Sequence, residues 1–283
     1  MIQNLDSHTL VLTANSRLST YLKKKYDMVQ SHTGKKTWQT LNCLPFDQWI
    51  YKVVENATTT HTILNDAQEL ALWENIISQA NCHNAIYHPF KIAEIAQQAW
   101  HLIKQWRVSL DEISTSFSSD DARLFHQWAT TFATICKKQR WLIQDDCTDL
   151  LIQALQTSTM DLPKNIVIAG FDEFTSQKKY LISLLEKYTH VNFYKTQKKT
   201  NTIPSRIKAT DENQEILYMA RWAKKTLFQY PNASIACVAP HLNQIHGKII
   251  SVFTEVFSDN PTDILNERTL PFNISSSHTF YEN

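Results

Sequence analysis

Glycine is scarce in this sequence: Gly34, Gly170 and Gly247 are the only three in 283 residues. Glycine usually makes up about 7% of a protein. The phosphate-binding motif G-x-x-x-x-G-K-[ST] needs two glycines five residues apart, and GKKT (Gly34 to Thr37) has Val29 five residues before Gly34 and Lys36 where Ser or Thr is required. The same shortage excludes the serine-nucleophile motif G-x-S-x-G. We therefore expect neither a phosphate-binding loop nor ATP hydrolysis.

Several other patterns are also missing. Five scattered cysteines without a Cys-x-x-Cys pair argue against a disulfide framework and a zinc site, and favour a reducing compartment. No H-E-x-x-H motif occurs, and none of the 27 acidic residues has Lys two positions later, so the D/E-x-K core of a metal-dependent nuclease is absent. No signal peptide or membrane-spanning stretch is present, which predicts a soluble, cytoplasmic protein without a membrane partner. Because the phosphate-loop and metal-binding motifs are missing, we expect no cofactor. The cysteines are Cys43, Cys82, Cys136, Cys147 and Cys237.

Charge is balanced, with 28 Lys and Arg against 27 Asp and Glu. Bulk charge therefore predicts neither a nucleic-acid partner nor a membrane partner. Any basic surface must be local.

Hydrophobic patterning indicates an α/β protein. Short apolar runs at TLVLTA (9–14), TWQTLNCL (37–44), NIVIAG (165–170), VNFYKT (191–196) and SIACVAP (234–240) alternate with helical patterns, whereas 65–156 carries helical patterns only. This alternation predicts a parallel sheet flanked by helices, with an all-helical insertion and the start of a second α/β domain near Arg206. The predicted ranges are 1–60 and 161–200 for the first domain, 61–160 for the insertion, and 201–283 for the incomplete second domain.

The Asp172-Glu173 pair follows the predicted strand NIVIAG. Paired acids at the end of a strand can hold magnesium and activate water in phosphate-handling enzymes. Without a phosphate loop, we favour the alternative that the acids cap the helix that follows.

Basic residues are grouped in the sequence, and such groups can contact nucleic-acid phosphates or simply form a solvated helix face. The first group, Arg17 with Lys23, Lys24 and Lys25, begins directly after the TANSR segment (13–17). The remaining groups are Lys35 and Lys36, Lys178 and Lys179, and Lys195, Lys198 and Lys199.

Five blocks together resemble the N-terminal helicase-like part of AddB-like and RecB-like DNA repair proteins of the PD-(D/E)XK nuclease superfamily. The blocks are LVLTANSRLSTYLKKKYD, TWQTLNCLPFDQWI, NIVIAGFDEFT, IACVAPHLNQIHGKIISVFTEVF and LPFNIS. The resemblance implies an inactivated superfamily I helicase of P-loop NTPase type, with domain 1A, a helical 1B insertion and the start of domain 2A.

The resemblance also implies roles for individual residues. Asn15 and Arg17 would correspond to motif Ia and lie near a single DNA strand, and Thr40 and Trp49 would belong to the motif Ib region. Asp172 and Glu173 would be the relic of a Walker B pair.

The sequence departs from the family at its end. Family members continue into the rest of the helicase fold and a nuclease, whereas this sequence ends at Asn283, soon after PFNIS. We therefore expect a fragment, a split gene or a frameshifted product, and no nuclease activity can be transferred to this chain.

These patterns lead to one main hypothesis and two alternatives. The main hypothesis is a non-catalytic, helicase-like DNA-binding or scaffolding segment of a DNA repair or recombination nuclease, with DNA (a single strand or a duplex end) and a nuclease or helicase chain as partners. One alternative is a nucleotide-dependent enzyme that uses Asp172 and Glu173. The other is a protein-interaction module whose helical block docks a partner subunit. The tryptophans proposed as its anchors are Trp73, Trp100, Trp106 and Trp128.

Overall fold

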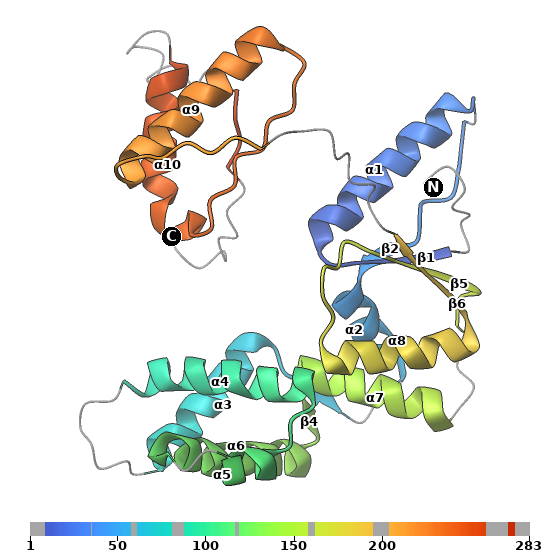
Figure 1. The fold of residues 1–283 in the computed structure, drawn as a ribbon. Helices are drawn as coiled ribbons and strands as arrows, with labels where there is room; N and C mark the ends of the chain where they lie inside the picture. Colours follow the sequence, from blue (N-terminus) through green and yellow to red (C-terminus); the bar gives the residue numbers. More distant parts are fainter. Residues whose placement is uncertain are drawn as a thin grey trace. The chain divides into compact units, whose positions relative to one another are not determined.

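The computed structural model describes residues 9–34, 36–57, 61–80, 88–116, 119–157, 162–194, 204–258 and 271–274. The chain forms two compact units, Met1–Gln197 and Lys198–Asn283, which we describe separately (Figure 1). Within the ranges given above, no helix combines the length and the apolar character needed to cross a membrane.

Four parallel strands form the sheet of the first unit. Their spatial order is β2 (Cys43–Pro45), β1 (Thr9–Thr13), β5 (Asn165–Ala169) and β6 (His190–Tyr194). Parallel neighbours need long crossover connections, which include α1 (Ser16–His32), α2 (Phe46–Ala57) and α8 (Ser176–Tyr188). The predicted α/β class with a helix-flanked parallel sheet is therefore confirmed.

Helices cover both faces of the sheet (Figure 1). Leu10 and Ile166 contribute to the larger core layer, together with side chains of α2, α8 and α7 (Gln144–Thr157). Val11 and Val167 contribute to a smaller layer beneath α1. Successive strand residues point to opposite faces, so both layers need apolar side chains and the central strands are almost continuously apolar.

A helical region lies between β2–α2 and β5 in the chain. Its core is centred on Trp73, whose ring stacks on Phe132 with centroids 4.4 Å apart. Asn65 and Gln68 form a capping box at the start of α3, because Asn65 Oδ1 accepts from the Gln68 backbone N–H and Gln68 Oε1 accepts from that of Asn65. The elements are β3 (Thr62–Ile63), α3 (Asp66–Gln79), α4 (Pro89–Trp106), α5 (Leu110–Ser116), α6 (Asp120–Gln139) and β4 (Trp141–Leu142). The prediction that this insertion is all-helical was wrong, because β3 and β4 pair in parallel as a short two-stranded sheet.

Helix α7 belongs to the sheet layer, although the range predicted for the insertion (61–160) includes it. Cys147, Leu151 and Leu155 are buried in the core that also contains α2, α8 and the strands. The helical region that packs around Trp73 therefore ends before α7.

In the described part of the second unit, α9 (Glu212–Gln229) packs on α10 (Leu242–Phe257). Their shared core contains Ile216, Ala220, Ile249 and Phe253. The prediction of a strand at 234–240 was wrong, because this segment has no strand structure and no strand occurs in 204–258 or 271–274. A strand needs a neighbour to pair its backbone groups, and apolar sequence alone does not supply one.

Candidate nucleic-acid interface

The turn after β1 is fixed by local hydrogen bonds. The Thr13 hydroxyl donates to the backbone oxygen of Asn15 at 2.9 Å, and Asn15 Oδ1 accepts from the Leu18 N–H at 2.9 Å. Asn15 is thus the N-cap of α1, and its side-chain oxygen is used within the protein. The residue predicted to lie near a DNA strand therefore has a structural role in orienting α1.

Helix α1 presents a basic face to solvent. We call Arg17, Tyr21, Lys24, Lys25 and Met28 the α1 face, since all five are exposed and lie on one side of the helix: Tyr21 follows Arg17 by four residues, and the adjacent Lys24 and Lys25 each lie three or four residues from both Tyr21 and Met28. Tyr21 is 56% exposed, and Lys25 Nζ lies 5.7 Å from the centre of its ring. The three cations form no ion pair with the residues that the structure describes. They are therefore available to an anionic partner.

Lys23 does not belong to this face. It is partly buried, and the side chains near it include Cys43 on β2. Burial raises the pKa of the Cys43 thiol, while the Ser19 hydrogen bond and the charge of Lys23 act in the opposite direction. Because each residue turns the helix by about 100°, three consecutive lysines cannot share one face.

The acidic residue of α1 is occupied elsewhere. Asp27 Oδ1 accepts a hydrogen bond from Trp38 Nε1 at 2.8 Å, which joins α1 to the segment that precedes β2. This contact fixes the Asp27 carboxylate at the junction between α1 and that segment.

The two residues of the motif Ib-like block lie in contrasting environments. Thr40 is exposed in the segment before β2. Trp49 is only 6% exposed and packs edge-on against Phe46, with ring centroids 6.1 Å apart. A ring buried in this way is not accessible for base stacking, so Trp49 is a core residue of α2 in this structure.

Asp172 and Glu173 are both exposed in the loop between β5 and α8. The expectation that they cap the next helix was wrong, because α8 begins at Ser176 and its N-cap is Thr175. The first turn of α8 contains no acidic residue. Within the described ranges, no group of three or more His, Cys, Asp or Glu side chains is arranged to hold a metal ion.

The residues around the acidic pair determine the shape of this loop. Gly170 has φ +80°, and an added Cβ there would collide with Leu18 of α1. Phe171 stacks on Phe174 with ring centroids 4.8 Å apart and meets Phe46 edge-on at 5.8 Å. The loop is therefore anchored by its glycine and phenylalanines, which sequence analysis passed over in favour of the acids between them.

The other basic groups offer less to a ligand. Lys178 forms an ion pair with Asp47, with Nζ 2.8 Å from Oδ1, while its neighbour Lys179 is exposed. Lys36 is exposed in the segment after α1. Lys35, Lys195, Lys198 and Lys199 lie outside the described residues.

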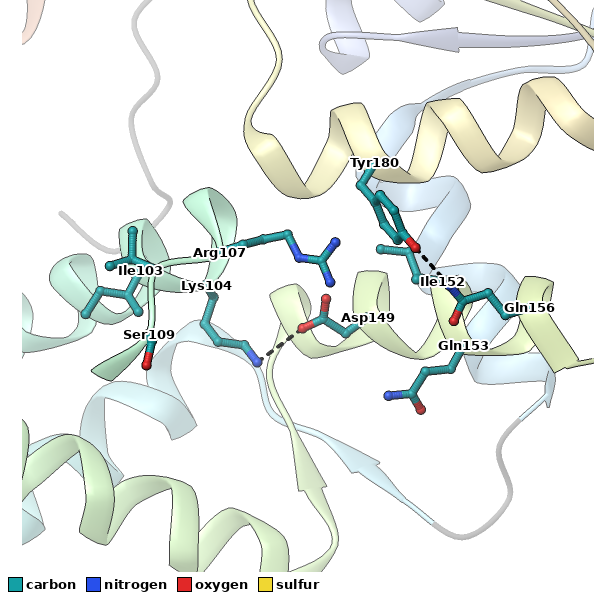
Figure 2. Close-up of a pocket in the computed structure, with 10 residues that line it drawn as sticks. Ile103, Lys104, Arg107, Ser109, Asp149, Ile152, Gln153, Gln156 and Tyr180 are labelled. Atoms are coloured by element: carbon teal, nitrogen blue, oxygen red, sulfur yellow. Dashed lines mark hydrogen bonds and ion pairs between the residues drawn. The ribbon is translucent and has the colours of Figure 1, made fainter. Parts of the chain in front are cut away.

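A cavity of about 500 Å³ opens between α4, α7 and α8 (Figure 2). Its polar groups already contact one another: Lys104 Nζ lies 3.2 Å from Asp149 Oδ2, and Gln156 donates to the Tyr180 hydroxyl at 2.9 Å. The Arg107 guanidinium lies 4.6 Å from the centre of the Tyr180 ring. The polar side chains that line the cavity therefore serve to join α4, α7 and α8.

A buried ion cluster joins the helical region to the sheet layer. His101 Nδ1 of α4 lies 2.6 Å from Asp145 Oδ2 of α7, and His101 Nε2 lies 3.4 Å from Glu69 Oε2 of α3. The hydrogen bond to Asp145, then that to Glu69, raises the pKa of His101 to about 10, against the opposing effect of burial. His101 is therefore an imidazolium at neutral pH with a structural role.

Comparison with known proteins adds no relative to this picture: no protein-family model matches the chain, and no curated protein matches it significantly.

Proposed function

We propose that this chain is a non-catalytic, helicase-like segment of a DNA repair or recombination nuclease, which binds DNA or acts as a scaffold. The observation that carries the proposal is the α1 face, which displays Arg17, Lys24 and Lys25 along a helix that packs on the sheet. Cations that form no ion pair among the described residues can contact nucleic-acid phosphates, and such contacts release counterions from the nucleic acid, which makes binding favourable at low salt.

The arrangement of the elements supports the same proposal. A helical region is inserted between strands of one parallel sheet, as the resemblance to helicase-like repair proteins implies. The TANSR segment, which runs from the last residue of β1 into the first turn of α1, contains no glycine, and Asn15 Oδ1 caps the N-terminus of α1 where a phosphate loop would hold a phosphate. These features favour a binding role over a nucleotide-dependent motor that uses Asp172 and Glu173.

A salt titration of single-stranded DNA binding, followed by fluorescence anisotropy, tests the proposal. The triple variant Arg17→Glu/Lys24→Glu/Lys25→Glu should weaken binding at least tenfold at low salt. It should also reduce the slope of log affinity against log salt by about 2, since each phosphate contact contributes about 0.7 for a single strand.

Three single variants provide a matched comparison and a charge control. Lys24→Gln should weaken binding more than Lys23→Gln, because only Lys24 belongs to the α1 face. Lys52→Glu, on the exposed side of α2, controls for overall charge. Wild-type protein that fails to bind at low salt, or a triple variant with unchanged affinity, would refute the proposal.

A specific observation also favours the interaction-module alternative. Helix α4 exposes Ile95 (66%), Leu102 and Trp106 (40%) at positions that share one side of the helix. Trp73, Trp100 and Trp128, by contrast, are buried in the core of the helical region. Trp106 is thus the proposed anchor that solvent can reach, and unchanged DNA binding by the α1 variants would direct attention to this stripe.

A further inference from the structure

Helix α9 of the second unit has an outward side that mixes aromatic and basic residues. All four residues of what we call the α9 face are exposed, and Tyr218 and Lys225 each lie three or four residues from both members of the adjacent pair Arg221 and Trp222, which places the four on one side of the helix. Tyr218 is 39% and Trp222 is 52% exposed. The opposite side of the helix is the one that packs on α10.

The charges of the α9 face are not neutralised within the described residues. Arg221 and Lys225 form no ion pair there, whereas Lys224, on another side of the helix, donates to the Val256 backbone oxygen at 2.8 Å. Lys248 is likewise paired, with Glu212. Glu215, one turn before Tyr218, is the exposed acidic residue nearest to this face. The middle of the face is therefore positive.

The mixture of aromatic and basic side chains on the α9 face suits a nucleic-acid strand better than a protein partner. Protein interfaces favour aromatic residues and Arg but are depleted in Lys, and cations buried in such an interface lose water and need matching acids to compensate. A nucleic-acid strand has a partner for both kinds of side chain, since its phosphates pair with the cations and its bases stack on the rings. A duplex conceals the flat faces of its bases, so the rings favour a single strand.

We propose that the α9 face is a second nucleic-acid contact surface, which binds a single strand by stacking bases on Tyr218 and Trp222 and by pairing phosphates with Arg221 and Lys225. This inference rests on the proposed function and adds a preference for unpaired bases to it. Two surfaces on one chain also make binding bivalent, so a strand long enough to reach both binds more tightly than either surface alone would.

The experiment uses the full chain with oligo-dT of increasing length, oligo-U and a blunt DNA duplex. Tyr218→Ala/Trp222→Ala should weaken binding to long oligo-dT by roughly fivefold or more per ring, because base stacking is lost, and leave duplex binding unchanged. Arg221→Glu/Lys225→Glu should reduce the salt slope by about 1.4. In both variants, the gain in affinity with strand length should shrink.

Matched controls come from exposed residues elsewhere. Tyr188→Ala on α8 removes an exposed ring, and Lys208→Glu reverses an exposed charge in the second unit. Circular dichroism melts establish that each variant is folded. Oligo-dT bound more tightly than oligo-U would identify DNA as the ligand and the reverse would identify RNA, and either result supports a single-strand surface.

The α1 and α9 variants separate this inference from the proposed function. If the α9 variants bind like wild type while the α1 variants are weakened, the inference is overturned and the proposed function stands. Equal losses of duplex and single-strand binding in Tyr218→Ala/Trp222→Ala would also overturn it, since stacking would not be the cause. Absence of binding by wild-type protein would overturn both.

Discussion

Helices α1 and α9 carry similar basic and aromatic outer faces on very different supports. Helix α1 packs against a sheet whose central strands are buried on both faces. Helix α9 packs on α10 through a small cluster, and its unit leaves large apolar side chains such as Phe228 (88%) and Val238 in solvent. A small core gives little stability. Similar surface chemistry therefore occurs on a helix backed by a large core and on a helix backed by a small one. We expect the second unit to unfold first, because its described core is the smaller.

The largest expected effect comes from Phe253, which is buried between α9 and α10. Phe253→Ala should cost about 3–5 kcal/mol, enough to unfold a marginal unit. Amide hydrogen exchange should then show loss of protection in α9 and α10 but not in β1 or β5. Phe228→Ala, at an exposed site of the same unit, should change stability by less than about 0.5 kcal/mol. Simultaneous loss of protection in both units would contradict the comparison.

The next effect concerns the ion cluster in the first unit. His101→Leu leaves the buried carboxylates of Glu69 and Asp145 without their cation, and should lower the free energy of unfolding by about 3 kcal/mol at pH 7. The measurement is urea denaturation. His126→Leu is the control, because His126 Nε2 lies 3.9 Å from Asp111 Oδ1 and the expected change is under about 1 kcal/mol.

The same cluster predicts a pH dependence. The pKa of His101 is raised from its ordinary value of 6.5 to about 10. Its stabilisation is therefore fully present below pH 6.5, declines above that and is lost as the pH rises through about 10. The difference between wild type and His101→Leu should shrink over this interval. A constant difference would show that the imidazolium is not the stabilising species.

The three glycines provide a graded series of smaller effects. Gly170→Ala should destabilise the first unit by about 2 kcal/mol, because the positive φ at this position is strained for alanine and the new Cβ collides with Leu18. Gly34→Ala has a positive φ but open space around it, so about 1 kcal/mol is expected. Gly247→Ala, inside α10 and unobstructed, should stabilise the second unit by about 0.5–1 kcal/mol. Thermal melts that rank the variants differently would contradict these local explanations.

Local patterns predicted the elements of the first unit well. The apolar runs at 9–14, 165–170 and 191–196 contain most of β1, β5 and β6, whereas only Cys43 and Leu44 of the run at 37–44 belong to a strand, β2. These features depend on neighbours within a few residues, which the sequence displays directly. The run at 234–240 failed, since a strand also requires a partner that local sequence does not specify.

The candidate site was less predictable, because the availability of a side chain depends on three-dimensional neighbours. Lys23 and Lys24 are adjacent in sequence, yet one is partly buried near Cys43 and the other is exposed. Trp49 is a core residue, and Asp172 and Glu173 are exposed in a loop anchored by phenylalanines. The Tyr218–Lys225 stripe was present in the sequence at helical spacing, and that spacing was the signal that could have found it.

By itself, the sequence determined the α/β class of the first unit, the placement of a helical region between its strands and the absence of a phosphate loop. These follow from periodicity and composition, which act along the chain. The tertiary structure alone decided which cations reach solvent, which aromatic rings are buried, and that His101 joins three helices. The reason is physical, since burial and charge pairing arise between residues that are distant in sequence and adjacent only after folding.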